Sequence, residues 1–306
     1  MDTDSLRTFL AIHRTGGFSS AAERLGRSQP AISRRIALLE EELGAPLFDR
    51  AAGGVVLSQA GHVLLPLAQR ALAAIEDCRA AVVALRAGQT GPLALAAVGT
   101  LAGAGLTPAL RRFSQAHAGV ALTLRTAASS EVSELVRSGE ATIGLRYHRD
   151  RSGDLDCLEL AGERLLIACA ADHPLAGRTV PSLASLADEH WLAFPPTGRA
   201  REAVADSLSA LFLAHGVADL RWSAVDSLTA QKRLAEAGYG LAMLPGGAID
   251  EERAAGSLAV IDVAGLTLAN PVYVVTRRQG YLSPAATALI ALLRETSGDP
   301  PRPPSD

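Results

Sequence analysis

The sequence predicts an α/β protein built from a small helical N-terminal region, one long helix and a larger two-lobed domain. Residues 1–57 are rich in helix signals, and residues 58–87 have the pattern of one long helix. From residue 91 onward, short apolar strands alternate with helical stretches, which is typical of a sheet with parallel strands. The chain has 306 residues, of which 48% are apolar, so two or three domains with substantial cores are expected.

Composition narrows the class of protein. The formal net charge is −3, so contact with a polyanion needs a local basic patch. Asp2 and Asp4 replace the basic start of a secretion signal, and no apolar run reaches the roughly 18 residues of a membrane span. We expect a soluble, cytoplasmic chain without membrane contact. Cys78, Cys157 and Cys169 form no CxxC pair and have no histidine at metal-ligand spacing, so reduced thiols, no metal and no cofactor are expected.

Three short helices are expected at the N-terminus. The first covers about residues 4–14, and the second covers residues 20–25 with Ser19 as its N-cap. Gly26 allows the left-handed turn residue after the second helix. Ser28 caps the third helix. A helix, a tight glycine turn and a second helix form the helix-turn-helix pattern.

The third helix has two faces with different chemistry. The apolar residues Ile32, Ile36, Leu39 and Leu43 recur at spacings of 4, 3 and 4 and are expected to be buried. Four arginines (24, 27, 34 and 35) lie within twelve residues that contain no acid, which supplies a local basic patch. Glutamine can bond adenine and arginine can bond guanine in the major groove of DNA. The candidate DNA contacts of this segment are Arg27, Ser28, Gln29, Pro30, Ser33, Arg34 and Arg35.

A hairpin follows the third helix. Residues 47–50 (Leu-Phe-Asp-Arg) and 55–57 (Val-Val-Leu) flank a small-residue turn at residues 51–54. This hairpin is expected to be a wing, with Arg50 placed to meet backbone phosphate. The alternative is a helical subdomain whose arginine face is merely solvated, and the hairpin makes that alternative weaker.

The helix over residues 58–87 begins at Ser58, a good N-cap. Apolar residues recur along it at spacings of 3 or 4, and they would form a seam for pairing with a second chain. The predicted seam comprises Leu64, Leu67, Ala71, Ile75, Cys78 and Val82. The alternative is that this helix packs on the remainder of its own chain.

The remaining residues predict two lobes. The first covers about residues 91–163 and 268–296, the second covers residues 164–267, and residues 297–306 are expected to be a disordered tail. Two crossings between lobes create a cleft that can close on a small ligand. Ligands bind at the carboxyl ends of strands in such sheets. The candidate ligand-binding residues are Thr100, Ser129, Ser130, Arg146, Phe194, Thr197, Arg199, Asp226, Ser227 and Pro245.

Arg146 carries the most specific hypothesis about the ligand. It follows an apolar strand, where folding needs no charge, so it could pair with a ligand carboxylate together with Arg199. Thr100 and Ser129 precede helices, whose N-termini also favour an anion. The alternative, which we favour for Arg146, is an arginine bonded to a neighbouring acid of its own chain.

The stretch AAERLGRSQPAISRRIALLEEELGAPLFDR, followed by GVVLSQAG, occupies residues 21–61 and resembles the signature of LysR-type transcriptional regulators. One departure is small: Ser58 stands where the family often has threonine. The resemblance covers about residues 1–296. It implies a winged helix-turn-helix, a linker helix that pairs antiparallel, and a periplasmic-binding-protein-like domain for a small-molecule effector. It also implies an inverted-repeat DNA site, a homodimer that is often a tetramer, and RNA polymerase as a candidate partner.

Three other classes were weighed. An enzyme is disfavoured because the chain has no GxSxG, HExxH or P-loop motif. A solute-binding protein would share the two lobes but needs an export signal. A redox sensor would use Cys157 and Cys169, but Cys169 lies within an apolar strand, which favours an inert thiol.

Overall fold

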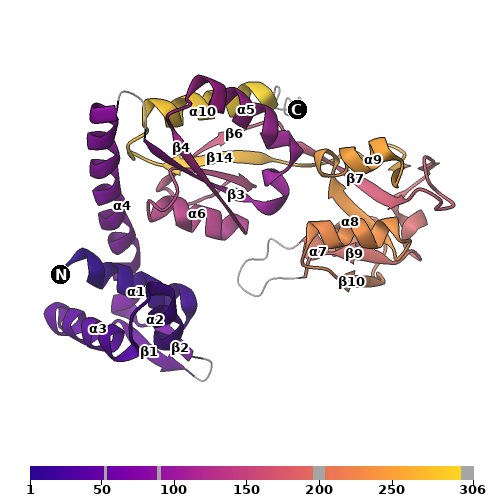
Figure 1. The fold of residues 1–306 in the computed structure, drawn as a ribbon. Coiled ribbons are helices and arrows are strands. Elements are labelled where there is room, and N and C mark those ends of the chain that lie inside the picture. The colour runs from indigo at the N-terminus through magenta and orange to yellow at the C-terminus, as the bar shows by residue number, and fades with distance from the viewer. Residues whose placement is uncertain (52–53, 88–90, 196–203, 298–306) are drawn as a thin grey trace.

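The computed structural model describes residues 1–51, 54–87, 91–195 and 204–297. A compact N-terminal domain, the long helix α4 and two lobes follow one another, and α4 connects the N-terminal domain to the first lobe (Figure 1). Thr197, Arg199 and residues 298–306 of the predicted tail lie outside the described residues, as does the side chain of Arg50.

The N-terminal domain contains α1 (Thr3–Thr15), α2 (Phe18–Leu25), α3 (Gln29–Leu43), β1 (Phe48–Ala51) and β2 (Gly54–Leu57). The two strands pair antiparallel, as expected for the wing. Helix α2 begins two residues earlier than predicted, because extended Gly17, and not Ser19, takes the N-cap position. Leu43 was also wrongly placed in the buried stripe: it lies in the last turn of α3 and is 42% exposed.

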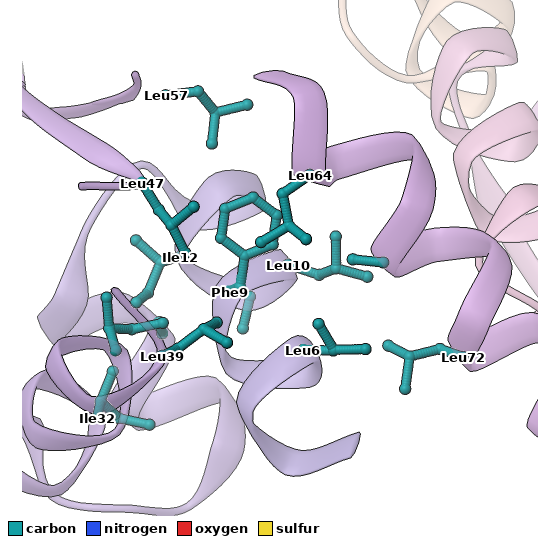
Figure 2. Packing of buried hydrophobic residues seen from close by; sticks show 14 of the residues in the cluster. Leu6, Phe9, Leu10, Ile12, Ile32, Leu39, Leu47, Leu57, Leu64 and Leu72 are labelled. Atoms are coloured by element: carbon teal, nitrogen blue, oxygen red, sulfur yellow. The ribbon is translucent and has the colours of Figure 1, made fainter. Parts of the chain in front are cut away.

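Leucine, isoleucine and phenylalanine side chains from all three helices meet in one core. Figure 2 shows Phe9 and Ile12 of α1 beside Ile32 and Leu39 of α3. Leu64 and Leu72 of α4 (Gln59–Ala87) lie on the same cluster. The beginning of the long helix is therefore a structural part of the N-terminal domain.

Ser58 caps α4 as predicted. The backbone N–H of Gly61 donates to its Oγ at 3.0 Å, and the hydroxyl donates to the carbonyl of Pro46 at 2.5 Å. These bonds satisfy an orphan N–H of the first turn and tie the helix start to the loop before the wing.

Lobe I is a five-stranded sheet in the order β4-β3-β5-β14-β6. Strand β3 (Pro92–Val98) runs parallel to β4 (Ala121–Ala127) and β5 (Ile143–Tyr147), whereas β14 (Val272–Arg277) is antiparallel to β5 and to β6 (Leu155–Glu159). The sheet is therefore mixed, because β14 returns from the other lobe and inserts antiparallel between β5 and β6. The parallel arrangement predicted for the first three strands is confirmed.

Helices cover both faces of the lobe I sheet. Helices α5 (Thr107–Ala116) and α10 (Pro284–Ser297) pack together over one core, and α6 (Ser129–Arg137) packs over a second. Two 3-10 turns, η1 (Gly99–Ala102) and η2 (Ala104–Leu106), precede α5 in place of a longer α-helix. Gly103 and Gly105 weaken the helix there, and Pro108 is tolerated in the first turn of α5.

Among its described residues, lobe II has a seven-stranded sheet, in which six strands follow the order β10-β9-β11-β7-β12-β8 and β13 pairs with β7. Its strands are β7 (Glu163–Ala170), β8 (Thr179–Val180), β9 (Trp191–Ala193), β10 (Trp222–Ala224), β11 (Leu241–Pro245), β12 (Leu258–Val263) and β13 (Leu268–Asn270). Its helical elements are η3 (Leu183–Leu186), α7 (Val204–Ala214), α8 (Leu228–Glu236), η4 (Gly246–Ala248) and α9 (Asp250–Ala255).

The chain returns to lobe I slightly later than predicted. Leu268 pairs with Leu165 and Asn270 with Glu163, so residues 268–270 belong to the lobe II sheet. The two crossings between lobes therefore lie side by side, before Glu163 and after Asn270. Within the described ranges, no helix combines the length and apolar character needed to cross a membrane.

We predict that Gly61→Ala destabilises the N-terminal domain. A Cβ at this position would lie 2.2 Å from the carbonyl oxygen of Leu47, a backbone atom that cannot rotate away. Overpacking of this kind costs about 1–3 kcal/mol. Urea unfolding of the full chain measures it, with Gly153→Ala as the control because a Cβ there meets nothing within 4 Å. Equal stability of the two variants would contradict the packing seen at Gly61.

Candidate nucleic-acid interface and effector site

The first turn and a half of α3 lies open on the surface. Ser28, Gln29 and Pro30 are exposed, and Arg34 is exposed one turn later on the same helix. Ser28 occupies the N-cap position, but its side chain makes no capping bond. Gln29 Nε2 donates to the Ser33 Oγ at 3.0 Å, which holds the two polar groups together on this surface. These four predicted contact residues and Ser33 therefore form one accessible polar face.

The basic patch is narrower than the sequence suggests. Arg27 pairs with Asp4 at 3.1 Å, and Arg35 pairs with the same carboxylate at 3.4 Å. In the part of the chain that the structure describes, Arg24 and Arg34 form no ion pair. The N-terminus of α1 therefore neutralises half of the patch, and Arg34 is its most available member on α3.

The wing is fixed to the helical part of the domain. The N–H of Val55 donates to the carbonyl of Gly16 at 3.1 Å, in the turn between α1 and α2. Gly54 has φ +130°, and a Cβ there would lie 2.9 Å from the same carbonyl oxygen, so the close approach requires glycine. Arg50 stands opposite Val55 in the hairpin register. The backbone that carries Arg50 is thus held beside the turn.

The outward face of α4 is apolar. Val63, Leu67, Ala71, Ala74, Cys78 and Val82 are all exposed and recur at spacings of 3 or 4. Val63 is 64% exposed and Val82 52% exposed. Four of the predicted seam residues lie on this face. Leu64 does not, because it is buried in the N-terminal core, and Ile75 is half-buried.

The inward face of α4 packs on lobe I. A Cβ on Gly139, in the turn after α6, would lie 3.0 Å from the Cα of Ala73, so this turn contacts the helix closely. Asp77 pairs with Arg277 and accepts the N–H of Tyr281 at 3.3 Å. Packing on the same chain and an exposed apolar seam are therefore both present, on opposite faces of α4.

The predicted effector residues lie at strand ends and helix starts. Ser129 is the first residue of α6 and is buried, and Ser130 is exposed beside it. Ser227 caps α8, accepting the N–H of Ala230 at 3.4 Å, and exposed Asp226 precedes it. Pro245 ends β11 and is buried, and Phe194 follows β9. Each lobe therefore presents a serine at a helix N-terminus.

Arg146 is bonded to an acid of its own chain. It is 5% exposed, and its Nη1 lies 2.7 Å from the Asp150 carboxylate and 2.6 Å from the Ser133 Oγ. Arg137 binds the same carboxylate at 3.0 Å. Burial raises the pKa of Asp150, but hydrogen bonds from Ser133 and Ser152 and the charge of Arg137 outweigh it and hold that pKa below its usual value. Arg146 thus contacts an acid of its own chain, as the alternative for this residue expects, and its role toward a ligand stays a prediction.

Two further polar residues lie at the junction of the lobes. Tyr147, at the end of β5, donates to Glu163 Oε2 at 2.6 Å, and its hydroxyl lies 2.8 Å from the Thr100 Oγ1. Burial, then the adjacent Glu163, raises the pKa of Tyr147. Burial likewise raises the pKa of Glu163. Our sequence reasoning missed both residues. Their positions beside Arg146 and at the start of an apolar strand were the available signals.

The cysteines differ in accessibility. Cys169 is buried in β7, where burial raises its pKa to about 11, and Cys157 is half-buried. A thiol with a raised pKa forms little of the reactive thiolate. This environment is that of an inert thiol at Cys169.

Comparison with known proteins identifies the family. The model of the bacterial regulatory helix-turn-helix protein, lysR family, matches residues 3–62, and that of the LysR substrate binding domain matches residues 86–298. The chain belongs to the LysR family of transcriptional regulators. It is 33% identical to the regulator TfdS of Cupriavidus pinatubonensis over 80% of this chain and 82% of that protein. It is 29% identical to CbbR of Rhodospirillum rubrum over 94% of each.

Solved structures agree with this assignment. The crystal structure of CbnR, a LysR family regulator, matches with a TM-score of 0.64 and 26% identity, over 98% of this chain and all of that chain. CbnR in complex with its target DNA matches with a TM-score of 0.61 and 26% identity, over 97% of this chain and all of that chain. The protein is therefore a DNA-binding transcriptional regulator with an effector-binding domain, and it is not an enzyme.

We predict that Asp150→Asn destabilises the protein by about 3 kcal/mol, because it removes the carboxylate that binds both the buried guanidinium of Arg146 and that of Arg137. Asp156→Asn is the matched control: its pair with Arg278 is solvent-exposed, and such pairs contribute about 0–1 kcal/mol. Urea unfolding measures both variants, and similar losses would contradict a structural role for Asp150.

The contribution of Asp150 to the stability of the fold changes with pH in a defined direction. The folded-state pKa of Asp150 is lowered, so its contribution is complete above the unfolded value of about 3.9 and is lost as pH falls towards the folded value. The destabilisation by Asp150→Asn should therefore shrink as unfolding is measured at increasingly acidic pH.

Proposed function

We propose that this regulator binds an inverted-repeat DNA site as a homodimer, which assembles further into a tetramer, and responds to a small anionic effector in the cleft between its lobes. The proposal rests on two surfaces, one on α3 and one on α4, that belong to the same continuous structural unit. The polar start of α3 can enter a groove, and the apolar outer face of α4 can join two such units.

The exposed start of α3 suits the major groove of DNA. Gln29, Ser33 and Arg34 belong to residue types that can hydrogen-bond to base edges. They lie on a helix whose N-terminus also favours phosphate. Arg50, on the wing, is proposed to contact backbone phosphate. Because the net charge is −3, this local surface must supply the attraction to DNA.

The apolar face of α4 has a self-complementary spacing. If two copies lie antiparallel, Val63 meets Val82, Leu67 meets Cys78 and Ala71 meets Ala74, all about one two-fold axis between positions 72 and 73. Every large exposed apolar residue of the face then has an apolar partner on the second chain. This register supports a two-fold dimer, and two-fold symmetry suits an inverted-repeat site.

An anionic effector is supported by the serines at the starts of α6 and α8. Helix N-termini carry unsatisfied N–H groups and partial positive charge, which favour anions. Ser129 comes from lobe I and Ser227 from lobe II, so an anion between them would contact both lobes. Arg146 is not part of this proposal, because Asp150 already binds its guanidinium.

We predict that combined Ser33→Ala and Arg34→Ala abolishes the preference for the DNA upstream of the regulator's own gene over a scrambled duplex. Each lost base contact costs about 1–3 kcal/mol of discrimination. Arg50→Ala should weaken binding to both duplexes alike and reduce the slope of log affinity against log salt by about one. Fluorescence anisotropy at several salt concentrations measures these effects.

The control for this experiment is Arg112→Ala. It removes one exposed arginine of α5, in lobe I, away from α3. It should leave both affinities unchanged. Retained discrimination in the Ser33 and Arg34 double variant would contradict the assignment of α3 as the base-reading helix.

We predict that Leu67→Cys forms a disulfide with the native Cys78 of a second copy under mild oxidation. In the antiparallel register these positions face each other. Two Cys78 residues would be displaced by about 16 Å along the helices, beyond the roughly 7 Å limit between bridged Cα atoms. Non-reducing electrophoresis should therefore show a crosslinked dimer for Leu67→Cys and none for the wild-type protein.

Combined Leu67→Cys and Cys78→Ser is the control and should not crosslink. A wild-type disulfide through Cys78 would indicate parallel helices. Absence of crosslinking in Leu67→Cys would contradict the proposed register while leaving the DNA-binding proposal to its own test.

A further inference from the structure

A pocket of about 200 Å³ lies where the two lobes meet. Lobe I contributes Leu101 and Leu106, α10 contributes Leu293, the crossing between lobes contributes Leu160, and Glu163 begins β7 of lobe II. Gly247 of η4 closes it from lobe II. We call this the junction pocket. It is smaller than the roughly 300–1,000 Å³ of sites for drug-sized ligands, so its occupant must be small.

The junction pocket has one charged lining residue, Glu163. Its Oε2 accepts the hydroxyl of Tyr147, and within the described ranges no cationic side chain pairs with it. The neighbouring Arg164 instead faces Asp262. A carboxylate without a cationic partner, set among leucines, is costly to desolvate unless it gains an opposite charge.

The remaining lining hydroxyls are already bonded. The Thr100 hydroxyl lies 2.8 Å from that of Tyr147, and the Thr296 and Ser297 hydroxyls donate to backbone carbonyls of α10. The polar group left to select a ligand is therefore the Glu163 carboxylate. The leucines require the rest of that ligand to be apolar.

The junction pocket differs from the anion site proposed above. Ser129 and Ser227, the two helix-start serines, are not among the residues that line it. A carboxylate ligand would be repelled by Glu163, whereas an ammonium group would be attracted. The two sites therefore select opposite charges.

We propose that the junction pocket binds a small primary amine with an apolar body, whose ammonium group pairs with Glu163. Because the walls come from lobe I, from the crossing and from lobe II, an occupant contacts both lobes beside the hinge. A bound amine therefore influences how far apart the two lobes lie, and it does so independently of an anion bound at the starts of α6 and α8.

Calorimetric titration of the full-length protein near neutral pH tests the proposal. The probes are benzylamine, benzyl alcohol and benzoate, which share one apolar ring and differ in the charge of the attached group. Benzylamine should bind, whereas the alcohol should bind much more weakly and benzoate should not compete with it. Absence of benzylamine binding, or equal binding of all three probes, overturns the proposal.

Two variants locate the site. Glu163→Gln keeps an acceptor for Tyr147 but removes the charge, and it should weaken benzylamine at least roughly tenfold. Gly247→Val adds a branched side chain to the lobe II wall of the pocket and should weaken benzylamine by narrowing it. A Cβ at Gly247 meets nothing within 4 Å, so the substitution itself causes no clash. Unchanged benzylamine affinity in both variants would place the amine elsewhere and overturn the proposal.

Tyr147→Phe is the matched control. It removes the hydroxyl bonded to Glu163 but keeps the carboxylate and the ring, so benzylamine affinity should stay within a few-fold of wild type. A loss equal to that of Glu163→Gln would make the hydrogen-bonded pair, and not the charge, the determinant, and would contradict the ionic mechanism. Unchanged thermal unfolding and DNA affinity of each variant, measured without amine, show that the fold is retained.

Discussion

The burial of one face of α4 in the N-terminal core fixes how the parts of this regulator are arranged. Leu64, Ala68 and Leu72 pack with α1, so the first half of the helix cannot move independently of the DNA-reading unit. The second half is held to lobe I through Ala73 and Asp77. The inner face of α4 packs on the N-terminal core and on lobe I, so its outer apolar face is the one available to a second chain. One helix thus positions the DNA reader and the effector domain and also carries the apolar face that we propose as the dimer surface.

The buried charges of lobe I separate structural groups from groups that can serve a ligand. Arg146 and Arg137 share Asp150, and a buried guanidinium that already has a carboxylate gains little from a second. Glu163 is different, because the described residues around it provide a tyrosine hydroxyl and no cation. Buried charge without a counter-charge is unfavourable in a folded chain unless a partner or ligand supplies one. Structural and ligand-binding charges differ in whether an opposite charge of the same chain pairs with them, and the sequence alone does not reveal these pairs.

Local signals in the sequence predicted the local structure well. The glycine turn, the Ser58 cap and the alternating hairpin each act within a few residues, and the structure contains all three. Periodicity alone could not tell which apolar stripe of α4 is buried, so Leu64 was assigned to the wrong face. Sheet order is also non-local, which is why the antiparallel return of β14 and the pairing of β13 with β7 were missed. Tyr147 and Glu163 meet only because β5 and β7 end and begin at the same junction.

Helix α6 links one of the proposed effector residues to the DNA-reading unit. It starts at Ser129, at the carboxyl end of β4, and spans nine residues, or about 14 Å. The turn after it places Gly139 against Ala73 of α4, and Glu140 pairs with Arg14 of α1. Arg14 and Arg125 outweigh the effect of burial and lower the pKa of Glu140, so the carboxylate stays ionised and keeps that pair. A ligand influences DNA binding only through states that it binds with different affinity. A displacement of α6 by a bound effector cannot leave the contacts of Gly139 and Glu140 unchanged, because these residues lie two and three positions beyond Arg137, where the helix ends.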